Sequence, residues 1–161
     1  SVSSISLRFF LYVMLRRSLM EADIHSREVA DYLSNMLAKF MEKDGWRKAP
    51  GHAGSVVDYE VDLYALIEKS GPCQRCEIHA FGGDRNLFMT GLHARFIRRR
   101  SERRGAPDLD FYENAGRMHY RSARDHPLAE EFAVRETFDH LASGFRNIRG
   151  RLNHLAEEYF N

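Results

Sequence analysis

The chain has 161 residues, of which 43% are hydrophobic and 29% charged, and its formal net charge is +1. This composition excludes a disordered chain, and two cysteines in this length exclude a disulfide scaffold. A chain of about 150 residues can bury roughly 70% of its unfolded surface, so we expect one domain over residues 1–161.

The strongest apolar stretch, from Phe9 to Leu15, is much shorter than the roughly 18 residues that a membrane span requires. Arg16 and Arg17 follow it directly, where a secretory signal would place small residues for cleavage. We therefore expect a cytoplasmic protein without a membrane span.

Residues 4–20 predict a helix that is apolar on nearly all sides. Its apolar side chains form two stripes at helical spacing: Leu7, Phe10, Leu11, Met14 and Leu15, and then Ile5, Phe9 and Val13. A helix of this kind lies at the centre of a core or is covered by a partner. The excess of apolar surface favours self-association or a protein partner.

Residues 26–44 carry the clearest helical pattern in the chain. One stripe holds all its large apolar residues: Val29, Tyr32, Leu33, Met36, Leu37, Phe40 and Met41. Ser26 is placed to cap the start of this helix, and Gly45 is a typical residue for its end. Trp46–Gly54 then predicts a loop.

Residues 56–69 fit two patterns. Val57, Tyr59 and Val61 alternate with acidic residues as in a strand, but Leu63, Leu66 and Ile67 continue at helical spacing. We favour a helix, because the only other candidate strand is Cys76–Phe81. A small β-hairpin near residues 57–81 remains the alternative.

The second half of the chain predicts further helices. Residues 85–100 have one apolar face, Asp110 and Glu113 have the spacing of a helix start, Pro127 begins the next helix, and Gly144 indicates a break. The last helix contains Ile148, Leu152 and Leu155. Together these segments predict an all-α protein, a compact bundle of six or seven helices.

Cys73 and Cys76 are the sharpest chemical feature. Two thiols at this spacing can form a disulfide or bind one metal ion, and His79 follows three residues later. One interpretation is two unrelated cysteines. A second is a zinc site in which Cys73, Cys76 and His79 are joined by a distant ligand such as His52 or His93, although the second half of a four-ligand pattern is missing.

The third interpretation is a dithiol redox centre. The Cys-x-x-Cys pair followed by a histidine resembles the all-helical alkylhydroperoxidase and carboxymuconolactone decarboxylase superfamily. That resemblance implies catalytic roles for Cys73, Cys76 and His79, with Glu60 matching the family's upstream glutamate. The family has three residues between the second cysteine and the histidine, whereas this chain has two, so the resemblance leaves the role of His79 open.

A basic cluster is the second chemical feature. It consists of Arg95, Arg98, Arg99, Arg100, Arg103 and Arg104, with Glu102 as the one acidic residue among them. Such arginines can bind the phosphates of a nucleic acid, although cations are also common at the exposed end of a helix. No aromatic interleaving or known nucleic-acid motif accompanies them.

Three short segments resemble an uncharacterised group of bacterial helical proteins: Ser6–Phe10, Ala30–Leu33 and Gly105–Tyr112. The resemblance implies a helical fold and no particular activity. Di-iron Glu-x-x-His pairs, nucleophile elbows and phosphate-binding glycine loops are missing from the sequence. The leading prediction is therefore a non-enzymatic interaction or self-association module with no predicted cofactor, and the alternative is the dithiol or metal site.

Overall fold

The computed structural model describes residues 2–52 and 54–160, with side chains from residue 6 onward. Within these ranges it contains nine α-helices and no strands. The helices are α1 (Val2–Glu21), α2 (Arg27–Phe40), α3 (Glu60–Lys69), α4 (Pro72–Leu92), α5 (Ala94–Arg104), α6 (Leu109–Asp125), α7 (Pro127–Glu131), α8 (Arg135–Ser143) and α9 (Phe145–Leu155). Two helical turns, η1 (Gly45–Arg47) and η2 (Ala156–Phe160), complete the described elements.

The all-α prediction is confirmed, including the helix favoured for residues 56–69, and the alternative of a small β-hairpin near residues 57–81 is wrong. Glu60–Lys69 and Pro72–Leu92 are helical instead. The carboxylate of Asp62 accepts hydrogen bonds from the backbone N–H groups of Asp58 and Tyr59, at 3.0 and 2.9 Å, so the start of α3 is capped. One of the acidic residues that alternate along this segment, Asp62, therefore caps a helix and does not mark the solvent face of a strand.

Two of the predicted helices divide, which is why the described residues form more helices than the expected six or seven. The centre of α4, in contrast, contains two glycines without a break. Gly82 and Gly83, which alone would suggest a turn, are buried in the middle of this 21-residue helix. The predicted helix over residues 85–100 is in fact two helices separated at His93. The segment after Pro127 also divides, at Phe132 and at Gly144.

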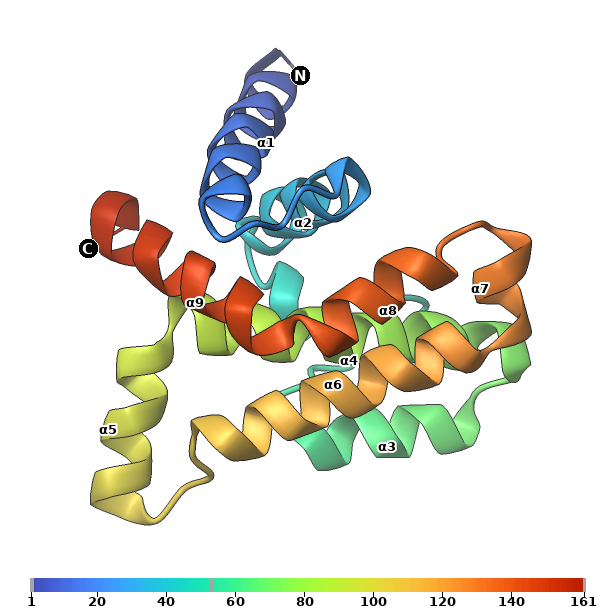
Figure 1. The fold of residues 1–161 in the computed structure, drawn as a ribbon. Helices are drawn as coiled ribbons and strands as arrows, with labels where there is room; N and C mark the ends of the chain where they lie inside the picture. The colour runs from blue at the N-terminus through green and yellow to red at the C-terminus, as the bar shows by residue number, and fades with distance from the viewer. Residues whose placement is uncertain (1, 53, 161) are drawn as a thin grey trace.

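The helices pack in layers around α4 (Figure 1). α4 and α6 lie side by side, α3 lies along one side of this pair, and α8 and α9 cross its other side. α1 packs on α2 and projects from the body, and α5 projects from the body below the end of α9. One continuous apolar core joins α1, α2, α4, α6, α8 and α9, and its fully buried members include Leu15, Leu33, Leu87, Leu141 and Phe145.

Two helix starts show how local sequence positions these elements. The Ser26 hydroxyl accepts from the Val29 N–H at 3.1 Å, as the capping prediction requires. For α6, however, the cap is Asp108, which accepts from the Phe111 N–H at 3.0 Å, and not Asp110. α2 ends at Phe40, five residues before Gly45, where the chain turns into η1.

Candidate functional site

The helix pair α4 and α6 packs closely enough to bring polar side chains together in the interior. A Cβ atom added to Gly82 would lie 2.8 Å from the ring of His119, and one added to Gly83 would lie 2.5 Å from the ring of Tyr120. Only glycine permits this approach, because any side chain would overlap the neighbouring ring. The glycines therefore give His119 its place against α4.

A chain of hydrogen bonds links α3, α6 and α4 in this interior. Glu60 Oε2 lies 2.8 Å from His119 Nε2, and His119 Nδ1 lies 3.0 Å from His79 Nδ1. Asn86 Nδ2 donates to Glu60 Oε1 at 2.6 Å. His119 is fully buried and the side chain of Glu60 is 10% exposed. We call Glu60, His79, Asn86 and His119 the Glu60 cluster.

The hydrogen bonds of the Glu60 cluster determine where its protons lie. Hydrogen bonds from His119 and Asn86 outweigh the effect of burial and lower the pKa of Glu60, so this carboxylate only accepts. His119 Nε2–H must then donate to it. Burial and the neighbouring His119 lower the pKa of His79 to about 4, so His79 is neutral at pH 7. When both rings are neutral, His79 Nδ1–H donates to His119, and His79 Nε2 keeps the ring's unprotonated lone pair.

Arg85 lies beside this cluster with much of its hydrogen-bonding capacity unused. The residue is 1% exposed, its Nη2 donates to the Asp58 carbonyl at 2.7 Å, and its guanidinium lies 5.6 Å from the centre of the Trp46 ring. Among the described residues its Nε and Nη1 atoms have no hydrogen-bond partner, and neither has Asn86 Oδ1. Buried polar atoms of this kind are uncommon in native interiors, so they single out this region of the core.

The sequence-predicted residues Glu60 and His79 are thus brought together, with His119 as the link between them. Cys76 is one helical turn before His79, is buried, and has its Sγ atom 3.8 Å from the carbonyl oxygen of Ala123 on α6. Burial and the charge of Glu77 raise the pKa of the Cys76 thiol. Cys73 is exposed in the first turn of α4, and both thiols are free.

The described residues contain no group of three or more His, Cys, Asp or Glu side chains arranged to hold a metal ion. His52, one of the suggested distant zinc ligands, lies 3.3 Å from the hydroxyl of Ser70. The other, His93, packs against the rings of Trp46 and Phe88.

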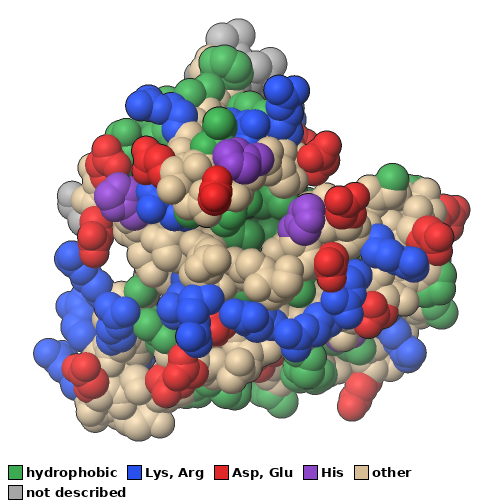
Figure 2. Space-filling view, in the orientation of Figure 1, with side chains coloured by type: hydrophobic (Ala, Val, Ile, Leu, Met, Phe, Trp, Pro, Cys, Tyr) green, Lys and Arg blue, Asp and Glu red, His purple; other side chains and the backbone are tan. Residues whose placement is uncertain are grey.

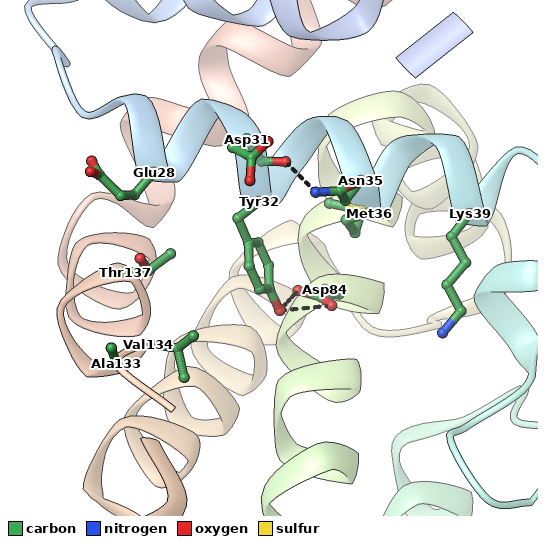
Figure 3. Close-up of a pocket in the computed structure, with 10 residues that line it drawn as sticks. All are labelled: Glu28, Asp31, Tyr32, Asn35, Met36, Lys39, Asp84, Ala133, Val134 and Thr137. Atoms are coloured by element: carbon green, nitrogen blue, oxygen red, sulfur yellow. Dashed lines mark hydrogen bonds between the residues drawn. The ribbon is translucent and has the colours of Figure 1, made fainter. Parts of the chain in front are cut away.

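A second polar site is a pocket of about 400 Å³ between α2 and α8, shown in Figure 3. Asp84 forms part of its lining and accepts hydrogen bonds from the hydroxyls of Tyr32, at 2.9 and 3.0 Å, and Tyr120, at 2.7 Å. Burial raises the pKa of Asp84 to about 7, although both tyrosines and the charge of Lys39 act in the opposite direction. The carboxyl group can therefore exchange a proton near neutral pH.

The arginine cluster of the sequence lies on α5, the helix that projects from the body (Figure 1). Its members Arg95 and Arg98 line a pocket of about 300 Å³ together with Asn153 and Glu157. The guanidinium of Arg100 lies over the ring of Phe96, 5.5 Å from its centre. The other members are Arg99, Arg103 and Arg104, all exposed.

The apolar first helix is buried on one side and exposed on another. Leu11, Met14 and Leu15 are buried against the body, whereas Leu7, Phe9, Phe10 and Val13 are 38–68% exposed. We call these four residues the α1 face; the side chain of Ile5 lies outside the described part of the chain. In the described ranges no helix is both long enough and apolar enough to cross a membrane.

No protein-family model matches this chain, and comparisons with curated proteins and with solved structures return no match. The two resemblances drawn from the sequence therefore remain predictions.

Sequence reasoning missed Asp84, Arg85, Asn86 and His119. The position of His119 in the sequence does not reveal its hydrogen bonds to Glu60 and His79. Asp84 and Arg85 gave no signal at all, because charged residues are normally solvated and nothing in the local sequence indicates their burial.

Proposed function

We propose that this chain is a self-associating helical domain that pairs with a second copy through the α1 face. The observation that carries the proposal is the exposure of two adjacent phenylalanines, Phe9 at 68% and Phe10 at 51%, on a helix that projects from the body. A phenylalanine side chain has roughly 200 Å² of surface, so at about 25 cal/mol per Å² burying the exposed parts contributes about 2.5–3.5 kcal/mol from each ring.

The α1 face also continues onto the other end of the chain. Phe10 makes an edge-to-face contact with Tyr159, with ring centres 6.4 Å apart, and Tyr159 and Phe160 are about half exposed. A continuous apolar patch on one side of a helix can serve as its own partner, because a twofold axis places the same residues on both sides of the interface. A second copy therefore fits this patch without a further partner.

The experiment measures molar mass by light scattering after size-exclusion chromatography, over a range of concentrations. The wild-type chain is expected to approach the mass of a dimer as its concentration rises, and Phe9→Ser with Phe10→Ser is expected to remain a monomer with unchanged helical circular dichroism. Phe132→Ser is the matched control, since Phe132 is also 68% exposed but lies outside the α1 face. A wild-type chain that stays monomeric at high concentration would contradict the proposal.

A second function is favoured by the Glu60 cluster: acid–base assistance to thiol chemistry at Cys76. The thiol stays protonated at neutral pH because its pKa is raised, so a nucleophilic thiolate requires a base. His79 Nε2 can take that proton while its own Nδ1 proton moves to His119 and the Nε2 proton of His119 moves to Glu60. In this series of proton transfers His79 and His119 each give one proton and receive one. The Cys76 thiol loses a proton, and Glu60 gains one.

Thiol reactivity tests this second function. The rate at which a disulfide reagent modifies Cys76 in a Cys73→Ser variant is expected to fall severalfold in His79→Gln and to lose its dependence on a group that titrates near pH 4. Metal analysis of the purified protein tests the zinc alternative separately. Equal modification rates and equal pH profiles with His79 and with His79→Gln would exclude the proton transfer from Cys76 to His79.

A further inference from the structure

Charge is unevenly distributed among the helices. α5, α6 and α9 together contain 12 arginines, no lysine and four acidic residues, which gives them a formal charge of +8. The whole chain carries +1, so the remaining residues carry −7. A net charge near zero therefore conceals a set of three helices that is strongly basic as a whole and an acidic remainder.

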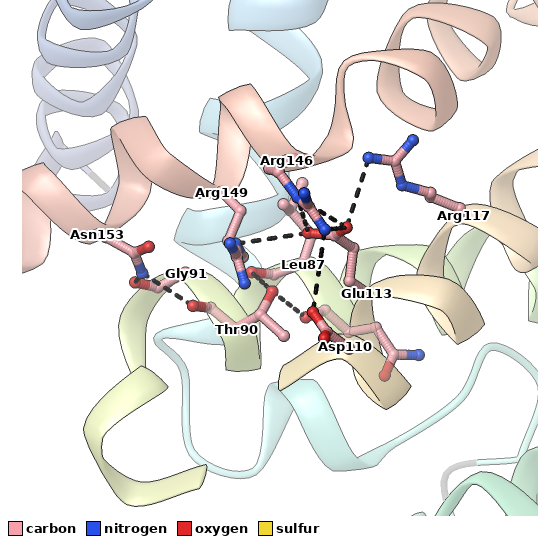
Figure 4. Close-up of polar contacts among 10 residues, drawn as sticks. Leu87, Thr90, Gly91, Asp110, Glu113, Arg117, Arg146, Arg149 and Asn153 are labelled. Atoms are coloured by element: carbon pink, nitrogen blue, oxygen red, sulfur yellow. Dashed lines mark hydrogen bonds and ion pairs between the residues drawn. The ribbon is translucent and has the colours of Figure 1, made fainter. Parts of the chain in front are cut away.

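A buried carboxylate gathers three of these arginines at the contact between α6 and α9 (Figure 4). The side chain of Glu113 is 3% exposed, and its oxygens lie 3.0 Å from Arg146, 3.5 Å from Arg117 and 3.7 Å from Arg149. Asp110 adds one weaker contact to Arg146, at 3.9 Å. Two carboxylates cannot neutralise three guanidinium groups, so positive charge remains on this surface.

The same surface continues from α9 to α5. Asn153, one helical turn after Arg149, donates to the carbonyls of Thr90 and Gly91 at 2.9 and 2.7 Å, which ties α9 to the end of α4. α5 begins two residues after α4 ends, and its Arg95 and Arg98 share a pocket with Asn153. Glu157 is the one acidic residue that lines this pocket.

We define the arginine band as Arg95, Arg98, Arg117, Arg146 and Arg149. Figure 2 shows Lys and Arg side chains crossing this face of the molecule in a row. The side chain of Arg146 is 63% exposed although it is hydrogen-bonded to Glu113, so its position is held while part of its guanidinium faces solvent. A guanidinium group that a hydrogen bond already holds in place loses less conformational entropy when a ligand binds to it.

We propose that the arginine band binds the phosphate backbone of a nucleic acid. The exclusive use of arginine on three helices supports phosphate as the ligand, because a face that is charged only for solubility normally mixes lysine and glutamate. The band extends over three helices, which fits a long polyanion better than a single small anion. Contacts confined to phosphate predict binding with little dependence on base sequence.

The experiment measures fluorescence anisotropy of a labelled 20-base-pair DNA duplex and of the matching single strand, with the full chain. About four phosphate contacts predict that affinity falls roughly 100-fold between 50 and 200 mM salt. Arg98→Gln with Arg146→Gln is expected to weaken binding and to reduce the slope of log affinity against log salt by about 2. Comparing the affinity for the duplex with the affinity for the single strand shows which of the two the arginine band prefers.

Arg27→Gln with Arg135→Gln is the matched control. These two arginines are exposed and lie on α2 and α8, outside the three basic helices, and their removal changes the net charge by the same amount. The control variant is expected to keep the wild-type affinity and salt slope. No binding at 50 mM salt, an equal loss in both variants, or equally tight binding of poly-glutamate would each overturn the proposal.

Discussion

Replacing Asp84 by asparagine tests the burial of a carboxyl group in the pocket between α2 and α8. Burial raises its pKa from 3.8 to about 7, which is a difference of about three units. Between pH 4 and pH 7 the folded chain keeps a proton that the unfolded chain has lost. The stability that this proton provides is present below about pH 4 and is lost as the pH rises through 7, and at about 1.36 kcal/mol per unit the loss is at most about 4 kcal/mol.

In the Asp84→Asn variant the side-chain amide would keep an oxygen to accept from the hydroxyls of Tyr32 and Tyr120 but would carry no charge at any pH. The free energy of unfolding of Asp84→Asn minus that of the wild type is therefore expected to rise by up to about 4 kcal/mol between pH 4 and pH 8. Urea unfolding followed by circular dichroism measures this difference. Asp31→Asn, an exposed change on the same pocket wall, is the control and should follow the wild type at both pH values. Parallel curves for Asp84→Asn and the wild type would refute the reasoning.

Two further substitutions test the packing around α6, both by urea unfolding. Glu113→Gln leaves three arginines without their buried carboxylate partner, so the free energy of unfolding is expected to fall by about 3–5 kcal/mol, and a fall below about 1 kcal/mol would contradict the assigned contacts. Gly83→Ala places a Cβ atom 2.5 Å from the ring of Tyr120, and such overpacking is expected to cost about 1–3 kcal/mol. Gly150→Ala is its control, because nothing lies within 4 Å of the added Cβ and the change should stabilise α9 by up to about 1 kcal/mol.

Local periodicity predicts the helices best where one face is buried and the other solvated. Residues 26–44 show this most clearly: Leu33, Leu37 and Phe40 are buried on one stripe, and the Ser26 cap lies where the sequence places it. The pattern left an alternative open where it served another purpose. The alternation around Tyr59 suggested a strand, but one of its acidic residues caps a helix.

The candidate sites were only partly predictable for a related reason. His79 was recognised from its spacing to the cysteines, and Glu60 only through the resemblance to the alkylhydroperoxidase superfamily. The sequence gives no sign that His119, 40 residues beyond His79, lies between them. The cysteines could be compared with known motifs because they are close in the sequence. The Glu60 cluster could not, because its members come from three different helices.

The sequence alone determined that this chain is helical and that its first helix has more apolar surface than one core face needs. It also determined the total charge, but not the separation of that charge into a basic and an acidic part. Only the tertiary structure decided that Asp84, Arg85 and His119 are buried and that Glu113 gathers three arginines. The physical reason is range: helix formation depends on residues three or four positions apart, whereas burial and ion pairing depend on which helices meet.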